Sequence, residues 1–72
     1  MENAVERFMF TEIGGVSIEL TGDPVACIYT VEVVEFGVVI SEENFMGLEE
    51  AVRDYTSTVE NEALEALVAF TS

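Results

Sequence analysis

The sequence predicts an α+β fold: a small antiparallel sheet of three to four strands in the N-terminal half, followed by one long or two shorter C-terminal helices packed on it. Three patterns predict this. Alternating apolar residues flank a Gly-Gly pair, β-branched residues dominate the next stretch, and apolar residues then recur every three to four positions. With 72 residues and no Pro-, Ser- or Gly-rich linker, residues 1–72 are expected to form a single domain.

The first predicted element is a β-hairpin over residues 7–21. Gly14-Gly15 is a strong signal for a two-residue turn, because glycine adopts positive φ without steric cost. The register that this turn sets gives three opposed pairs on one face of the hairpin: Met9 with Leu20, Thr11 with Ile18, and Ile13 with Val16.

One or two further strands are predicted over residues 25–40, after a turn at residues 22–24. Residues 25–33 alternate so that one face is fully apolar, and Cys27 falls on that face as a small core residue. Residues 36–40 are predicted to be a fourth strand after a turn at residues 35–37, or a bulged continuation of the third.

The C-terminal half is predicted to be helical, beginning at about residue 42 with Ser41 as the N-cap and two glutamates in the first turn. Ser57 and Glu60 have the spacing of a capping box, which favours one helix over about 42–57 and a second over about 58–70. The apolar stripe continues without a phase break, which favours one long helix. This stripe, expected to face the sheet, contains Phe45, Leu48, Val52, Tyr55 and Val59.

The charge is one-sided, because fifteen acidic residues stand against two arginines with no lysine or histidine, for a net charge of -13. Two arginines cannot form a phosphate-binding surface, so direct binding to nucleic acid is excluded. The same sign excludes anionic membrane surfaces, and no apolar stretch approaches the ~20 residues that span a bilayer. Because Cys27 is the only cysteine and no signal-peptide pattern is present, we expect a cytoplasmic protein.

Catalytic chemistry has no candidate residues in this sequence. Without histidine or lysine, neither the serines nor Cys27 has an obvious activating partner. Calcium loops, Cys/His clusters and phosphate-binding glycine loops are absent as motifs. We therefore expect a non-enzymatic protein with no cofactor and no metal site.

The acidic residues of the predicted helices suggest a partner instead. Helical phase would put Glu43, Glu50 and Asp54 in a row opposite the apolar stripe, with spacing comparable to that of successive phosphates. Such a one-signed surface predicts docking on a basic, nucleic-acid-binding surface of another protein. Small phage-borne inhibitors of restriction and CRISPR systems are similar in size, acidity and lack of catalytic residues. The full predicted partner surface comprises Glu42, Glu43, Glu49, Glu50, Asp54, Glu60, Glu62 and Glu65.

A second predicted surface is apolar. Phe8 and Phe10 should project from the face of the sheet opposite the hairpin's core residues, near Ile28. Either the C-terminal helix or a second copy of the chain would cover this face, so a homodimer is one expectation. Two other functions remain open: an acidic domain adapted to high salt, or a dimeric structural or adaptor module whose charge serves solubility.

Overall fold

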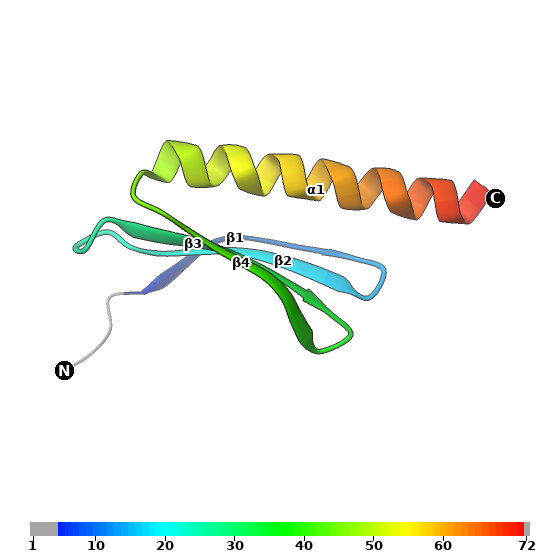
Figure 1. Ribbon diagram of the computed structural model, residues 1–72, viewed down its shortest axis with the longest axis horizontal. Coiled ribbons are helices and arrows are strands. Elements are labelled where there is room, and N and C mark those ends of the chain that lie inside the picture. The colour runs from blue at the N-terminus through cyan, green and yellow to red at the C-terminus, as the bar shows by residue number, and fades with distance from the viewer. Residues whose placement is uncertain (1–4, 72) are drawn as a thin grey trace.

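The computed structural model describes residues 5–71 and shows one antiparallel sheet with one helix lying along it (Figure 1). The strands are hydrogen-bonded in the order β1-β2-β3-β4, so each strand pairs with its neighbours in the chain. This arrangement confirms the predicted α+β class, with four strands. The elements are β1 (Glu6–Ile13), β2 (Val16–Asp23), β3 (Ile28–Glu35), β4 (Val38–Phe45) and α1 (Leu48–Thr71).

Two tight turns set the register of the sheet. Gly14 adopts φ 55° in the β1–β2 turn, and all three opposed pairs predicted for this hairpin are present. Phe36 and Gly37 adopt φ 50° and 84° in the β3–β4 turn, the left-handed pair that matches the twist of a two-residue hairpin. The fourth strand is therefore a separate strand rather than a continuation of the third.

The core lies between α1 and one face of β2 and β3. Ala51 and Tyr55 are the two buried residues of the helix, and the small Ala51 side chain lets the helix approach the sheet closely. The Tyr55 hydroxyl shares a hydrogen bond with the Thr11 hydroxyl of β1, so the ring is buried without leaving its polar atom unpaired. The sheet contributes Ile18, Leu20, Tyr29, Val31 and Val33.

The predicted start of the helix at Ser41 is wrong. Residues 38–45 pair with β3 instead, Ser41 lies opposite Val33, and Phe45 lies opposite Tyr29. The Ser-Glu-Glu signal is local, whereas pairing satisfies the backbone along a whole strand. The helix begins six residues later than predicted, where the Ala51 N–H donates to the Gly47 carbonyl (3.1 Å).

A single helix runs from residue 48 to residue 71, so the alternative with two helices is wrong. Ser57 lies inside this helix and caps nothing, while Val52 and Val59 pack partly buried against the core. Packing of the continuous apolar stripe therefore outweighs the low helix propensity of residues 56–58. No helix within residues 5–71 combines the length and the apolar character needed to cross a membrane.

The β2–β3 connection differs from the prediction, because the third strand begins at residue 28 rather than residue 25. One carboxylate oxygen of Asp23 accepts the backbone N–H groups of Val25 (3.0 Å) and Ala26 (3.2 Å), which closes an Asx-type turn. Cys27 ends this turn with φ 58° and is exposed, so its predicted place in the core is wrong.

A bulge in β1 moves Phe8 to the other side of the sheet. The pairing shifts between Arg7 and Met9, which leaves Phe8 as the extra residue. Its ring lies 5.9 Å from that of Tyr29, a residue of the core on the side of the helix. Phe8 therefore does not share the face of Phe10, contrary to the alternation that the sequence suggested.

Matched leucine substitutions test this placement of the core. Leu20→Ala should lower the free energy of unfolding by about 2–5 kcal/mol, because it leaves a cavity at a fully buried site. Leu48→Ala removes the same atoms from a side chain that is 43% exposed, so its cost should be clearly smaller. Urea denaturation measures both, and equal losses would contradict the described core.

Candidate partner-binding surface

The face of the sheet opposite α1 carries a row of three glutamates. Glu19 of β2 lies directly opposite Glu32 of β3, which in turn lies directly opposite Glu42 of β4. Directly opposed residues point to the same face, and here the alternating core residues assign the other face to the helix. Neighbouring Cα atoms in such a row are about 4.5–5.5 Å apart, so the three glutamate side chains leave the sheet from adjacent positions. We call Glu19, Glu32 and Glu42 the glutamate row.

One arginine neutralises only the β1 end of the glutamate row. Arg7 pairs through its Nε atom with the Glu19 carboxylate, and its guanidinium lies 4.7 Å from the centre of the Phe10 ring. Among the described residues, Glu32 and Glu42 form no ion pair. The β3–β4 side of the row is therefore negative without a compensating charge.

Uncharged side chains border the row on both sides. On one side, the Thr30 hydroxyl donates to the Asn44 amide oxygen across β3 and β4 (2.7 Å). On the other side, Val34 lies opposite Val39. These neighbours provide hydrogen-bonding and apolar contact beside the carboxylates but no positive charge.

The structure divides the predicted acidic row between two elements, because Glu43 lies on β4 while Glu50 and Asp54 lie on α1. Glu42 and Glu43 are consecutive residues of β4, so they point to opposite faces, and Glu43 lies beside Val31 on the side of the helix. Glu49 and Glu50 occupy the first turn of α1, and the remaining predicted acids are spread along that helix. Of the predicted partner residues, the structure places only Glu42 in the glutamate row.

Glu19 and Glu32 are the members of the row that sequence reasoning did not single out as binding residues. A signal was available, since the predicted hairpin register puts Glu19 on the face away from the core, and Glu32 falls on the mixed face of its strand. Sequence reasoning did not predict that β4 extends to residue 45. It placed residues 42–45 in a helix, so Glu42, the third member of the row, was not assigned to the sheet.

The second predicted surface is partly reproduced. Phe10 lies opposite Glu19 and is half-exposed on the open face of the sheet, where Ile28 also lies near the β2–β3 turn. Phe8 is absent from this face because the bulge in β1 turns it toward Tyr29. The helix does not cover Phe10 and Ile28, because it packs on the other side of the sheet.

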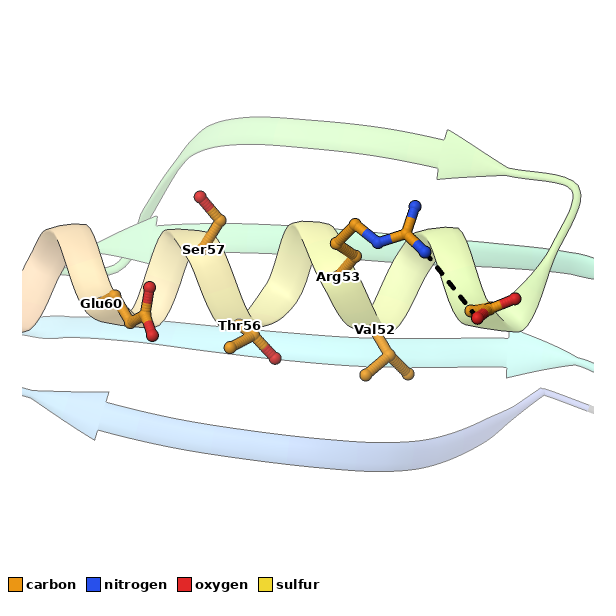
Figure 2. A pocket seen from close by; sticks show the side chains of 6 residues that line it. Val52, Arg53, Thr56, Ser57 and Glu60 are labelled. Atoms are coloured by element: carbon orange, nitrogen blue, oxygen red, sulfur yellow. Dashed lines mark ion pairs between the residues drawn. The ribbon is translucent and has the colours of Figure 1, made fainter.

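A hollow of about 450 Å³ lies on the outer flank of α1 (Figure 2). Arg53 and Glu49 form an ion pair there (3.8 Å), but both side chains are largely exposed, so the pair is of little energetic value. The hollow thus offers mixed charge rather than a single sign. Its lining residues are Glu49, Val52, Arg53, Thr56, Ser57 and Glu60.

A second set of acidic residues lies where the end of β3 comes near the helix. Partial burial raises the pKa of the Glu62 carboxyl above its ordinary value of 4.5, and the nearby charges of Glu65 and Glu35 raise it further. No group of histidine, cysteine or acidic residues suited to holding a metal ion occurs in the described part of the chain.

Comparison with known proteins identifies no relative. No protein-family model matches the chain, and neither the curated proteins nor the solved structures contain a significant match.

The Glu62 environment predicts a pH-dependent effect on stability. A carboxyl whose pKa is raised on folding destabilises the fold once it is charged, so this penalty is present at neutral pH and disappears below the ordinary pKa. Glu62→Gln should therefore raise the free energy of unfolding at pH 7 by about 0.2–0.5 kcal/mol, the size of a like-charge pair one helical turn apart. At about pH 3, below the ordinary carboxyl pKa, the gain should vanish.

Urea denaturation at the two pH values measures this effect, with Glu12→Gln on the open face as the control that removes one charge outside the group. A gain of equal size at both pH values, or an equal gain in the control, would show that the Glu35, Glu62 and Glu65 contacts are not responsible.

Proposed function

We propose that this chain is a non-enzymatic acidic binding protein that docks on a basic, nucleic-acid-binding surface of a cytoplasmic protein. The proposed role is that of an inhibitor or DNA mimic, as in phage proteins that act against restriction or CRISPR systems. The observation that carries the proposal is the glutamate row on the open face of the sheet, whose Glu32 and Glu42 have no cationic neighbour among the described residues.

The glutamate row opposes stability, which supports a role in binding. Like charges directly opposite each other on neighbouring strands are destabilising, yet this sheet has two such pairs side by side. Positions that violate a rule of sheet design without a structural benefit are expected at functional sites. A partner that supplies lysine or arginine side chains would relieve the repulsion at the moment of binding.

The spacing of the row suits a surface that normally holds phosphates. Three carboxylates on adjacent strands extend over about 10 Å, a length of DNA duplex that carries about six phosphates over both strands. Because Arg7 pairs with Glu19, the row carries about two uncompensated negative charges, against about three phosphates of one strand over that length. The net charge of -13 adds long-range attraction that accelerates encounter with a basic partner at low salt.

A charge-matched comparison tests which acidic surface binds. The open-face variant combines Glu19→Gln, Glu32→Gln and Glu42→Gln, and the helix variant combines Glu49→Gln, Glu50→Gln and Glu60→Gln, so each loses three charges. Immobilised wild-type protein should capture basic proteins from a bacterial lysate at low salt, and added duplex DNA should displace them. Capture by the open-face variant should fall on the order of tenfold or more, because each exposed contact contributes about 0–1 kcal/mol or more where water is excluded.

The helix variant should keep most of the wild-type capture. Equal losses in both variants would show that total charge, rather than the glutamate row, drives association, as expected of an acidic domain adapted to salt. Captured proteins that duplex DNA does not displace would contradict docking on a nucleic-acid-binding surface.

A further inference from the structure

Arg7 and Phe10 share the open face of the sheet because of the bulge in β1. Residues three apart in a regular strand point to opposite faces. Here Arg7 lies opposite Thr21 and Phe10 lies opposite Glu19, with the pairing shifted between Arg7 and Met9. Thr21 and Glu19 are two residues apart in β2, so the residues opposite them point to the same face. The bulge therefore brings a cation and an aromatic ring together at the β1 end of the glutamate row.

Two different contacts hold the Arg7 guanidinium. Its Nε atom pairs with the Glu19 carboxylate, and its Cζ atom lies over the Phe10 ring, 4.7 Å from the ring centre. A planar guanidinium suits this combination, because its N–H groups donate in the plane while its face stacks on the ring. Lysine carries a compact, strongly hydrated ammonium that pairs as a point charge and is found over aromatic rings less often. Glu19 and Phe10 thus have the chemistry of a guanidinium site, the name that we use for this pair.

The guanidinium site is open to solvent. The Arg7 side chain is 60% exposed, the Glu19 side chain is 25% exposed, and Phe10 is 47% exposed. Ion pairs with this exposure contribute little to stability. Arg7 also lies on β1, an edge strand of the sheet. A cation from another molecule can therefore reach the guanidinium site and replace Arg7 there with little loss of stability.

The two arginines of the chain are placed differently. Arg53 pairs with Glu49 one turn away on α1, which is an ordinary pair on a helix surface. Arg7 pairs from one strand to the next at the end of the glutamate row. A cation present only to relieve repulsion would serve better beside Glu32, which has a glutamate on each side. Relief of repulsion therefore does not explain why Arg7 lies at the end of the row and against a ring.

We propose that Arg7 holds, in the free chain, the position that an arginine side chain of the basic partner takes in the complex. This inference rests on the proposed function, because it names the partner group that the β1 end of the glutamate row receives. Arg7 then acts as an intramolecular competitor that weakens binding at this end of the row. A partner lysine that displaced Arg7 would replace a stacked guanidinium with an ammonium, so the competition favours partners that present arginine.

Titration of the full chain with defined peptides tests the proposal. The probes are two short peptides of equal length, one made only of arginine and the other only of lysine, at about 0.1 M salt. Arg7→Gln vacates the guanidinium site and should bind the arginine peptide about two- to fivefold more tightly than wild type, the gain expected from one exposed ion pair.

Arg53→Gln is the matched control, because it removes the same charge from the helix and leaves the open face unchanged. It should change the affinity for the arginine peptide much less than Arg7→Gln does. Circular dichroism should show both variants folded, since both arginine side chains are largely exposed.

Two further substitutions in the Arg7→Gln background test the guanidinium site itself. Adding Glu19→Gln should abolish the gain in affinity, because the vacated site then lacks its carboxylate. Adding Phe10→Leu removes the ring without a change of charge, so the preference for the arginine peptide over the lysine peptide should fall about two- to fivefold.

Equal gains in Arg7→Gln and Arg53→Gln would overturn the proposal, because net charge alone would then set the affinity. Unchanged or weaker binding by Arg7→Gln would also overturn it, since Arg7 would then not compete with the peptide. So would a gain that persists without Glu19. Failure of the proposed function is seen separately, in captured proteins that duplex DNA does not displace.

Discussion

Packing of one helix against one face of the sheet is the constraint on which the rest of the structure depends. Ala51 and Tyr55 are the only buried helical residues among those described, and they lie over the apolar residues of β2 and β3. Tyr55 fills the space above the sheet with a large ring and pairs its hydroxyl with Thr11, so the helix is also tied to β1. Within residues 5–71, α1 is the one helix, and it covers one face of the sheet only.

The open face of the sheet is the face that this packing leaves uncovered. Because no helix packs there, the side chains of Glu19, Glu32 and Glu42 remain accessible in a row that the sheet register holds in place. Like charges directly opposite each other on neighbouring strands are destabilising in general, and a basic partner of the kind proposed would offset such repulsion.

The mismatch in length between helix and sheet gives the molecule a second distinct surface. Residues 63–71 at the C-terminal end of α1 carry one charged side chain, that of Glu65, while the rest of the chain is strongly acidic.

The amino-acid sequence by itself determined the α+β class, the register around Gly14-Gly15 and the helical stripe at Val52, Tyr55 and Val59, because these follow from local turn chemistry and periodicity. Tertiary structure alone decided that residues 41–45 form a strand, since Ser41, Glu42 and Glu43 satisfy the local rules of a helix start and only pairing with β3 overrides them. It also decided the bulge that turns Phe8 toward Tyr29, which alternation along one strand cannot reveal. The glutamate row depends on the register of three strands at once, and register is a property of pairs of strands rather than of any single stretch of sequence.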